Sequence, residues 1–182
     1  MADALSQRLR LEVLILRCQL GDVAAFGRLA DQYDAPARYY VRRLLGVSDA
    51  ADDVVQETWL AVARGLPSLR KPDSFPAWFY RIARNKAVER IRQNEMFAAT
   101  CCEEVEELED ASEEAAFSPE DAASVHAALD KLAPPHREVL ALRFIEDMSY
   151  EEIAQVVGCG VGTVRSRLFY AKKALRKGME EQ

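Results

Sequence analysis

The chain has 182 residues, of which 49% are hydrophobic and 30% charged, and its net charge is −6. This composition is typical of a globular protein and excludes collagen-like and linker-dominated chains. No run approaches the roughly 18 apolar residues of a membrane span, and no export signal is recognisable, so we expect a cytoplasmic protein without membrane insertion. The cysteines at positions 18, 101, 102 and 159 lack metal-ligand spacing, so we expect reduced thiols, no metal and no cofactor.

The negative charge is concentrated in one segment. Residues 1–93 carry 15 Lys and Arg against 11 Asp and Glu, and residues 122–182 carry 9 against 8. Residues 94–121 carry 11 acidic residues and no Lys or Arg. Two weakly basic blocks therefore flank an acidic segment, and the acidic total does not argue against a nucleic-acid partner.

Hydrophobic residues in the first block recur with helical spacing. One predicted helix carries Phe26, Leu29, Ala30 and Tyr33 on one face and has Asp22 as its expected N-cap. The helical face over 40–45 is expected to stop at Gly46. A further helix over 49–64 has Ser48 or Asp49 as its cap and a stripe of Val55, Trp59 and Val62. The last helix of the block, over 75–93, follows Ser74 as its cap and is expected to bury Phe75, Phe79, Ile82, Val88 and Ile91.

The rest of the chain begins with the acidic segment, which is too repulsive to pack a core and is expected to be a flexible linker. Residues 119–182 indicate three or four short helices: the first over 119–132, and the next carrying Val139, Leu142 and Phe144. The expected fold is all-α: an N-terminal helical domain over 1–93, an acidic linker over 94–118 and a C-terminal helix-turn-helix domain over 119–182.

The helix-turn-helix pattern lies near the C-terminus. Ser149 and Glu152 form a predicted capping box, and Gly158-Cys159-Gly160 is the expected turn. The buried stripe of the second helix is expected to hold Val161, Val164, Leu168, Ala171 and Leu175. Residues expected outside, where they could meet DNA bases and phosphates, are Arg165, Ser166, Phe169, Tyr170, Lys172, Lys173 and Arg176. The alternative is a solvated cationic helix end.

The predicted helix over 75–93 carries a second cationic face. Its polar residues are Arg81, Arg84, Asn85, Lys86, Arg90 and Arg92, interleaved with Trp78, Phe79 and Tyr80. Cations and aromatic rings together can grip a nucleic-acid strand, because bases stack on rings while phosphates meet cations. The alternative is that the aromatic residues form the core and the cations only solubilise the helix, and for Phe79 we favour this core interpretation.

The predicted helix over 49–64 carries a polar cluster of Asp49, Asp52, Asp53, Gln56 and Glu57. Paired carboxylates suggest acid–base or metal chemistry. The chain has only two histidines, and no Gly-rich phosphate loop is present. A metal-dependent nuclease using Asp52 and Asp53 would lack its further ligands. We therefore expect no catalytic residues, and we interpret the cluster as a docking face for a basic partner.

Three segments resemble bacterial RNA polymerase sigma factors of the sigma-70 family. Asp53-Val54-Val55-Gln56-Glu57-Thr58-Trp59 is similar to the D-x-V-Q-E-x-[FW] segment of that family. The segment over 75–85, FPAWFYRIARN, resembles the promoter-melting helix that follows it. Segments 149–154 and 161–168 resemble the C-terminal helix-turn-helix. Two modules with one short connector are similar to the extracytoplasmic function (ECF) group, which lacks a middle domain.

The resemblance implies a role for each surface. Core-polymerase binding, at the β′ clamp helices, would fall to Asp53, Gln56 and Glu57. The set implied for the −10 promoter element is Trp78, Arg81, Arg84, Asn85, Lys86 and Arg90, with Asn85 and the 66–73 loop holding a flipped base. The set implied for the −35 element is Thr163, Arg165, Ser166, Arg167, Phe169, Tyr170 and Lys173. At two positions this chain differs from some members of the family: Leu69 lies in the loop where they have an aromatic residue, and Tyr170 stands where they have an arginine.

Further partners also follow from the resemblance. The C-terminal module would sit on the polymerase β flap, and the acidic linker would thread the channel that later carries RNA. An anti-sigma factor is a further implied partner. The function expected is that of an alternative sigma factor, which is not an enzyme. The alternatives are a helix-turn-helix regulator that acts without polymerase docking and a helical protein-binding adaptor. Residues 1–20 form a predicted apolar helix that packs on the first module or offers a partner surface.

Overall fold

The computed structural model describes residues 2–46, 50–93, 129 and 132–180, and the regular elements in these ranges are all helical. The all-α expectation is therefore confirmed. The chain divides into two compact units, residues 1–93 and 94–182, which are described separately. The acidic linker, most of the helix expected over 119–132 and the caps Ser48 and Asp49 lie outside the described residues. In the part of the chain that the structure describes, no helix is long and apolar enough to cross a membrane.

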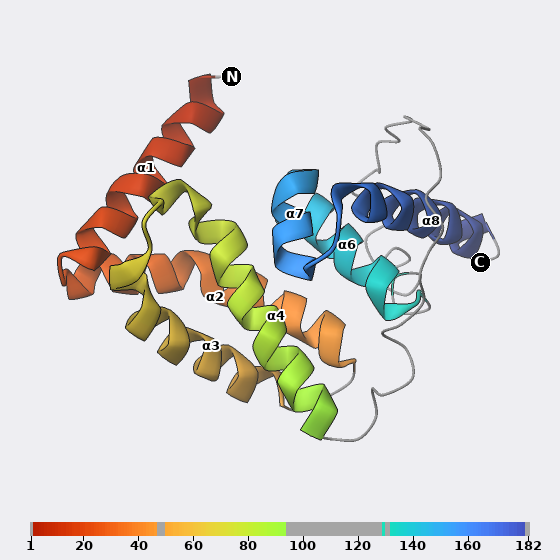
Figure 1. Cartoon of the computed structure of the whole chain (residues 1–182), viewed down its shortest axis with the longest axis horizontal. Helices are drawn as coiled ribbons and strands as arrows, with labels where there is room; N and C mark the ends of the chain where they lie inside the picture. The colour runs from red at the N-terminus through yellow and green to blue at the C-terminus, as the bar shows by residue number, and fades with distance from the viewer. Residues whose placement is uncertain (1, 47–49, 94–128, 130–131, 181–182) are drawn as a thin grey trace. The chain divides into compact units, whose positions relative to one another are not determined.

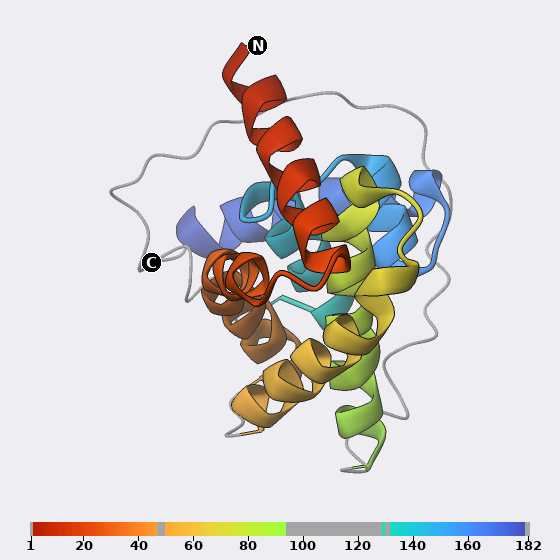
Figure 2. The same ribbon diagram turned by 90° about the vertical axis from the view of Figure 1, so that its left-hand side faces the viewer.

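Unit 1 is a helical bundle (Figure 1). Its elements are α1 (Ala2–Gln19), α2 (Val23–Leu45), α3 (Ala51–Gly65), the 3-10 turns η1 (Leu66–Ser68) and η2 (Pro72–Ser74), and α4 (Phe75–Gln93). Helices α2, α3 and α4 pack against one another, and α1 lies against α2 and both turns. Figure 2 shows the N-terminal turns of α1 projecting beyond the other elements of unit 1.

Helix ends in unit 1 follow the sequence signals at two of three positions. Asp22 accepts a hydrogen bond from the Ala25 N–H at 3.0 Å, which confirms it as the N-cap of α2. This bond, followed by the one from Arg17, lowers the pKa of the Asp22 carboxyl. Gly46 ends α2 with a φ of 74°, a conformation that glycine adopts without strain. The Ser74 hydroxyl donates to the Lys71 carbonyl at 2.7 Å, so it closes η2 and does not cap α4.

An aromatic cluster joins the helices of unit 1. The Phe79 ring is fully buried, and its centroid lies 5.0 Å from that of Trp59 and 5.3 Å from those of Tyr33 and Tyr80. Phe75 adds a further ring at 5.7 Å. Tilted and edge-on arrangements at these distances are favourable beyond the burial of area alone. The core interpretation of Phe79 is confirmed.

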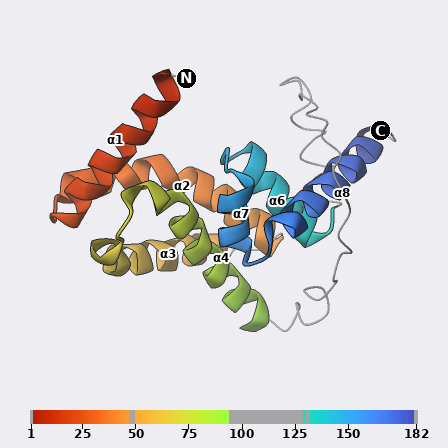
Figure 3. The same ribbon diagram turned by 45° about the horizontal axis from the view of Figure 1, so that its top comes forward.

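Unit 2 contains α6 (Pro134–Phe144), α7 (Tyr150–Val157) and α8 (Val161–Glu180), each in contact with the other two (Figure 3). The capping box is present: the Glu152 N–H donates to the Ser149 hydroxyl oxygen at 3.2 Å, and the Ser149 N–H donates to the Glu152 carboxylate at 2.8 Å. Gly158 ends α7 in the left-handed region with a φ of 76°, as the predicted turn requires.

The buried stripe of α8 is confirmed for four of its five residues. Val164, Leu168, Ala171 and Leu175 are each at most 3% exposed, whereas Val161 is half-buried. In α6 the Phe144 ring is 48% exposed, at the C-terminal end of the helix. Val139 and Leu142 of the same helix are fully buried. Phe144 follows Leu142 by two residues, a spacing that turns it away from the core side of a helix.

Replacing Phe79 with alanine is expected to destabilise unit 1 by about 3–5 kcal/mol, because a large buried ring would leave a cavity between three helices. Both tryptophans, Trp59 and Trp78, belong to unit 1, so denaturant unfolding followed by tryptophan fluorescence reports this unit. The control is Phe169→Ala in unit 2, whose ring is 42% exposed and which should leave the transition unchanged. Equal midpoints for Phe79→Ala and the parent chain would contradict the central role of this ring.

Candidate nucleic-acid and protein interfaces

The acidic face of α3 consists of Asp53, Gln56 and Glu57. Spacings of three and four residues place these side chains on one side of the helix. The side chain of Asp53 is 69% exposed and that of Glu57 45% exposed, and Gln56 is also exposed. The buried side of α3 is formed by other residues, namely Val54, Val55, Thr58 and Val62. The structure therefore brings the three predicted docking residues together on one accessible surface.

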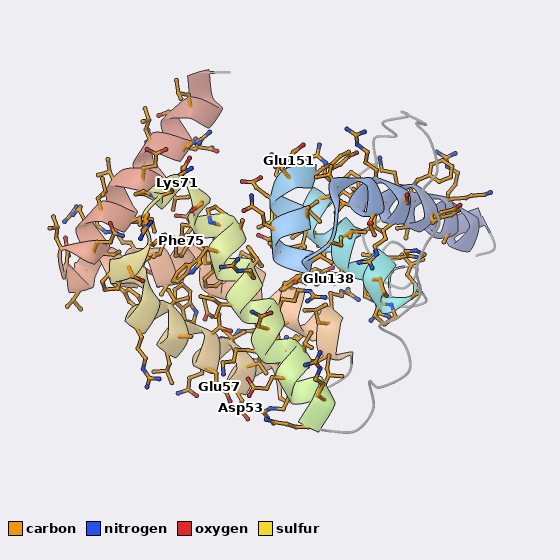
Figure 4. All side chains as sticks on the ribbon, viewed as in Figure 1. Asp53, Glu57, Lys71, Phe75, Glu138 and Glu151 are labelled. Carbon is orange, nitrogen blue, oxygen red and sulfur yellow. The ribbon has the colours of Figure 1, made fainter. Side chains whose placement is uncertain are left out.

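This acidic face is paired with cations from α4 (Figure 4). The Arg90 guanidinium lies 3.1 Å from the Glu57 carboxylate and 3.9 Å from that of Asp53. Lys86 lies 3.6 Å from Glu57 and 3.2 Å from Glu89 on its own helix. The hydrogen bond to Glu89, followed by the attraction of Glu57, raises the pKa of the Lys86 ammonium. The residues predicted for polymerase docking and two of those predicted for DNA binding therefore share ion pairs.

Asp52 lies beside the acidic face but has a different set of partners. It pairs with the guanidinium of Arg38 from α2, and Arg42 approaches it at 3.6 Å. Arg38 also donates to Asp34 at 2.7 Å, and these two carboxylates raise the pKa of Arg38, with Asp34 the larger cause. Asp34 in turn accepts a hydrogen bond from the Trp59 indole at 3.2 Å. Asp52 therefore ties α3 to α2.

Sequence reasoning missed Arg38 as the residue that organises this network. The i, i+4 spacing of Asp34 and Arg38 in a predicted helix was a usable signal for an ion pair between them. The ion pair between Arg38 and Asp52 depends on how α2 and α3 pack, and this packing cannot be predicted from the spacing of residues within one helix.

The residues predicted for the −10 element differ in accessibility. Arg81 and Asn85 are exposed and lie four residues apart on one face of α4, and Arg84 is half-buried between those positions. Lys86 and Arg90 are half-buried in the ion pairs with α3. The face formed by Arg81 and Asn85 is therefore the part of the set that is open to a ligand.

Trp78 has a packing role on the same helix. Its ring lies 6.0 Å from that of Phe75, and a Cβ added at Gly65 would come within 2.8 Å of Trp78 Cζ2. Glycine at the end of α3 therefore lets the indole approach the backbone closely. The Trp78 side chain is half-buried, which leaves part of the ring accessible.

The outer face of α8 is defined by Arg165, Phe169 and Lys173, which follow one another at intervals of four residues and are all exposed. The Phe169 ring is 42% exposed and lies edge-on to that of Tyr170, with centroids 5.5 Å apart. Three other residues predicted for the −35 element are half-buried, namely Thr163, Arg167 and Tyr170.

Two residues expected on that outer face lie elsewhere. Ser166 is only 5% exposed, and its hydroxyl donates to the Gly162 carbonyl at 3.1 Å, so the expectation that it lies outside is wrong. A serine side chain is short enough to bond back to the carbonyl four residues earlier. The Lys172 ammonium lies over the Phe144 ring, 5.4 Å from its centroid, and its side chain is half-buried.

The fold and these surfaces define an all-α protein with a helix-turn-helix unit and a second helical unit that presents neighbouring acidic and cationic faces. The models of two families match the chain: Sigma-70 region 2 over residues 29–96 and Sigma-70, region 4 over residues 122–175. The chain is 35% identical to the RNA polymerase sigma-H factor of Pseudomonas aeruginosa, with 92% of each chain covered. It is 32% identical to the ECF RNA polymerase sigma-E factor of Escherichia coli (strain K12), with 94% of this chain and 95% of the relative covered.

Solved structures show the same similarity. The structure of CnrH in complex with the cytosolic domain of CnrY matches with a TM-score of 0.67 and 27% identity, covering 94% of this chain and 98% of that one. The sigma factor RpoE in complex with the anti-sigma factor NepR from Bartonella quintana shares the fold, with a TM-score of 0.66, 23% identity and coverage of 87% and 98%. This chain belongs to the sigma-70 family of RNA polymerase sigma factors, in the ECF group. It is a transcription-initiation factor and not an enzyme.

Proposed function

We propose that the two units of this sigma factor divide the work of promoter recognition. Unit 1 docks on core RNA polymerase through the acidic face of α3 and binds the −10 element through α4. Unit 2 binds the −35 element through the outer face of α8 and sits on the polymerase β flap. The observation that carries the proposal is that Asp53, Gln56 and Glu57 form one accessible face on a helix whose opposite side is buried.

The acidic face suits a basic protein partner because α3, the helix that carries it, is held rigidly by contacts on its other sides. The Asp52–Arg38 pair ties the start of α3 to α2, and Trp59 packs against Phe79 further along the helix. Side chains displayed on such a fixed helix lose little conformational entropy on binding. Charged groups at a docking surface mainly fix orientation and speed the encounter, so we expect this face to determine how unit 1 is oriented on the polymerase.

The ion pairs between α3 and α4 link the two binding events. A basic polymerase surface that takes over Asp53 and Glu57 would compete with Arg90 and Lys86 for these carboxylates. The released cations could then meet DNA phosphates. Asn85 lies on the exposed side of α4 with Arg81, and an amide can pair with a base edge as both donor and acceptor. Polymerase docking is therefore expected to increase the affinity of unit 1 for DNA.

Three exposed residues of α8 support a reading role for unit 2. Arg165 lies near the start of the helix, where side chains reach base edges, and an arginine can donate two bonds to guanine. The exposed Phe169 ring suits contact with a thymine methyl group. Lys173, two turns after Arg165, lies where a recognition helix leaves the groove and meets phosphate. Ser166 is left out of this set because its hydroxyl bonds to Gly162.

Two further parts of the proposal rest on the relatives. The solved structure of CnrH contains the cytosolic domain of CnrY, and that of RpoE contains the anti-sigma factor NepR. By analogy, we expect an anti-sigma protein to bind this chain. Because core polymerase and promoter DNA are cytoplasmic in bacteria, we also place the chain in the cytoplasm.

Docking on core polymerase can be tested with the double substitution Gln56→Ala and Glu57→Ala. We expect the affinity for core polymerase to fall by roughly tenfold or more, because two groups of the acidic face are removed while the core of α3 stays intact. The measurement is a titration of labelled protein with purified core enzyme. A matched control is Asp31→Ala with Gln32→Ala, which removes an exposed acid and an exposed amide from α2.

The control double variant should bind core polymerase like the parent chain. Circular dichroism of both variants checks that the helices remain. Equal affinities of the two double variants for core polymerase would contradict the assignment of the acidic face, as would a loss of helix content specific to the Gln56 and Glu57 variant.

Base reading by unit 2 can be tested with Arg165→Ala. We expect holoenzyme carrying this variant to lose discrimination at one position of the −35 element, by roughly 1–3 kcal/mol. Lys173→Ala, which removes an exposed cation further along α8, should weaken binding to all sequences alike. It should also reduce the slope of log K against log salt concentration by about one. The measurement is a binding series over −35 variants at several salt concentrations. A uniform loss with Arg165→Ala would make Arg165 a phosphate contact and contradict its reading role.

A further inference from the structure

One face of α1 is apolar and exposed, and neither binding surface described above uses it. Its residues, here called the α1 seam, are Leu5, Leu9, Val13, Leu16 and Leu20, which are 61%, 53%, 57%, 49% and 87% exposed. Leu20 lies just after the last residue of the helix. The other side of α1 is the packed side, where Ile15 is fully buried and Leu11 and Leu14 are half-buried.

The seam has the spacing of a short coiled coil. Leu9, Val13, Leu16 and Leu20 follow at intervals of four, three and four residues, which places Leu9 and Leu16 at d positions and Val13 and Leu20 at a positions of a heptad. Among parallel coiled coils, a β-branched residue at a with leucine at d favours two strands, and Val13 with Leu16 follows this rule. Residues at the remaining b, c and f positions include Leu14, Ile15 and Leu11, which face unit 1. The pattern therefore suits a two-helix contact on the open side of α1.

Charges beside the seam distinguish between the possible orientations of a second helix. Glu12 is at a g position and Arg17 at the following e position, so a parallel copy brings Glu12 of one chain beside Arg17 of the other, twice by symmetry. An antiparallel copy would bring Arg10 and Arg17 together, both at e positions. In the single chain these edge residues have half-buried partners or are half-buried themselves: Glu12 pairs with Arg8 at 3.4 Å and Arg17 with Asp22 at 2.5 Å, and pairs between two copies would replace them.

The rest of unit 1 prepares α1 for such a contact. Because α1 is already folded against α2, η1 and η2, binding of a second copy does not have to offset the free-energy cost of helix nucleation. Its N-terminal turns project beyond the other elements of unit 1 in Figures 1 and 2. The exposed seam offers on the order of 500 Å² per copy, less than the roughly 800 Å² of a standard interface, so the contact is expected to be weak and concentration-dependent.

We propose that this chain forms a parallel homodimer through the α1 seam, with Val13 and Leu16 at its centre and Glu12–Arg17 pairs on both edges. This inference goes beyond promoter recognition and does not depend on it. The dimer uses residues that belong to neither the acidic face of α3 nor the outer face of α8.

Sedimentation equilibrium of the full chain over a range of concentrations tests the dimer. We expect a monomer–dimer equilibrium whose dissociation constant rises at least about a hundredfold with Leu9→Glu, because the substitution places two charges in the seam. The matched control is Leu60→Glu: this leucine of α3 is also 53% exposed but lies outside the seam, and its substitution should leave the equilibrium unchanged. A parent chain that stays monomeric at every concentration overturns the proposal, as does an equal effect of the two substitutions.

Oxidative cross-linking tests the orientation. With Leu9→Cys, a parallel dimer places position 9 of both copies at facing d positions, and a disulfide between them is expected on oxidation. Leu60→Cys serves as the control and should give no such link, and mass spectrometry separates the new disulfide from any made by the native cysteines. An antiparallel pair would set Leu9 near Leu20 of the other copy. Absence of the link at position 9, with dimer present, overturns the parallel arrangement.

Discussion

The packing of Phe79 against rings from α2, α3 and α4 is the constraint on which both surfaces of unit 1 depend. Because this ring is fully buried, the side of α4 that carries it must face the bundle, and Arg81 and Asn85 are turned to the outside. The contact of Phe79 with Trp59 fixes α3 at the same time. The Trp59 indole in turn donates a hydrogen bond to Asp34, which belongs to the ion-pair network with Arg38 and Asp52. One aromatic cluster thus determines where the acidic face of α3 and the cationic face of α4 lie. The ion pairs from Arg90 and Lys86 to Glu57 follow from that placement.

These ion pairs give the free protein a partly neutralised surface. Each pair is exposed enough to water that its contribution to stability is small, so a binding partner can exchange it at little cost. In the proposed function, exchange on polymerase would free Arg90 and Lys86, which belong to the set of residues proposed for the −10 element. The acidic segment over 94–121, with 11 carboxylates and no Lys or Arg, is expected to weaken DNA binding by the free chain further, because its charge repels phosphate or competes for the basic units. Dependence of DNA binding on polymerase is therefore consistent with the charge distribution of the whole sequence.

Much of the local structure could be predicted from the sequence. The Asp22 cap, the stop at Gly46, the Ser149–Glu152 capping box and the buried stripe of α8 are signals contained within a few residues, and the structure confirms them. The tertiary links could not be predicted, because the reach of Arg38 from α2 to Asp52, and of Arg90 from α4 to Glu57, depends on how the helices pack. Ser166 shows a different limit: its position on the helix suggested an outer residue, but the residue is buried and its short hydroxyl donates to the Gly162 carbonyl one turn earlier.

The most direct test of the account is transcription from total genomic DNA of the source bacterium by purified core polymerase, with and without this chain, followed by sequencing of the transcript 5′ ends. If this chain directs core polymerase to promoters, discrete start sites should appear only when the chain is present. These sites should share two upstream sequence elements at the −10 and −35 positions, separated by a nearly constant spacer. Start sites that are identical with and without the chain, or chain-dependent sites without common upstream elements, would contradict it.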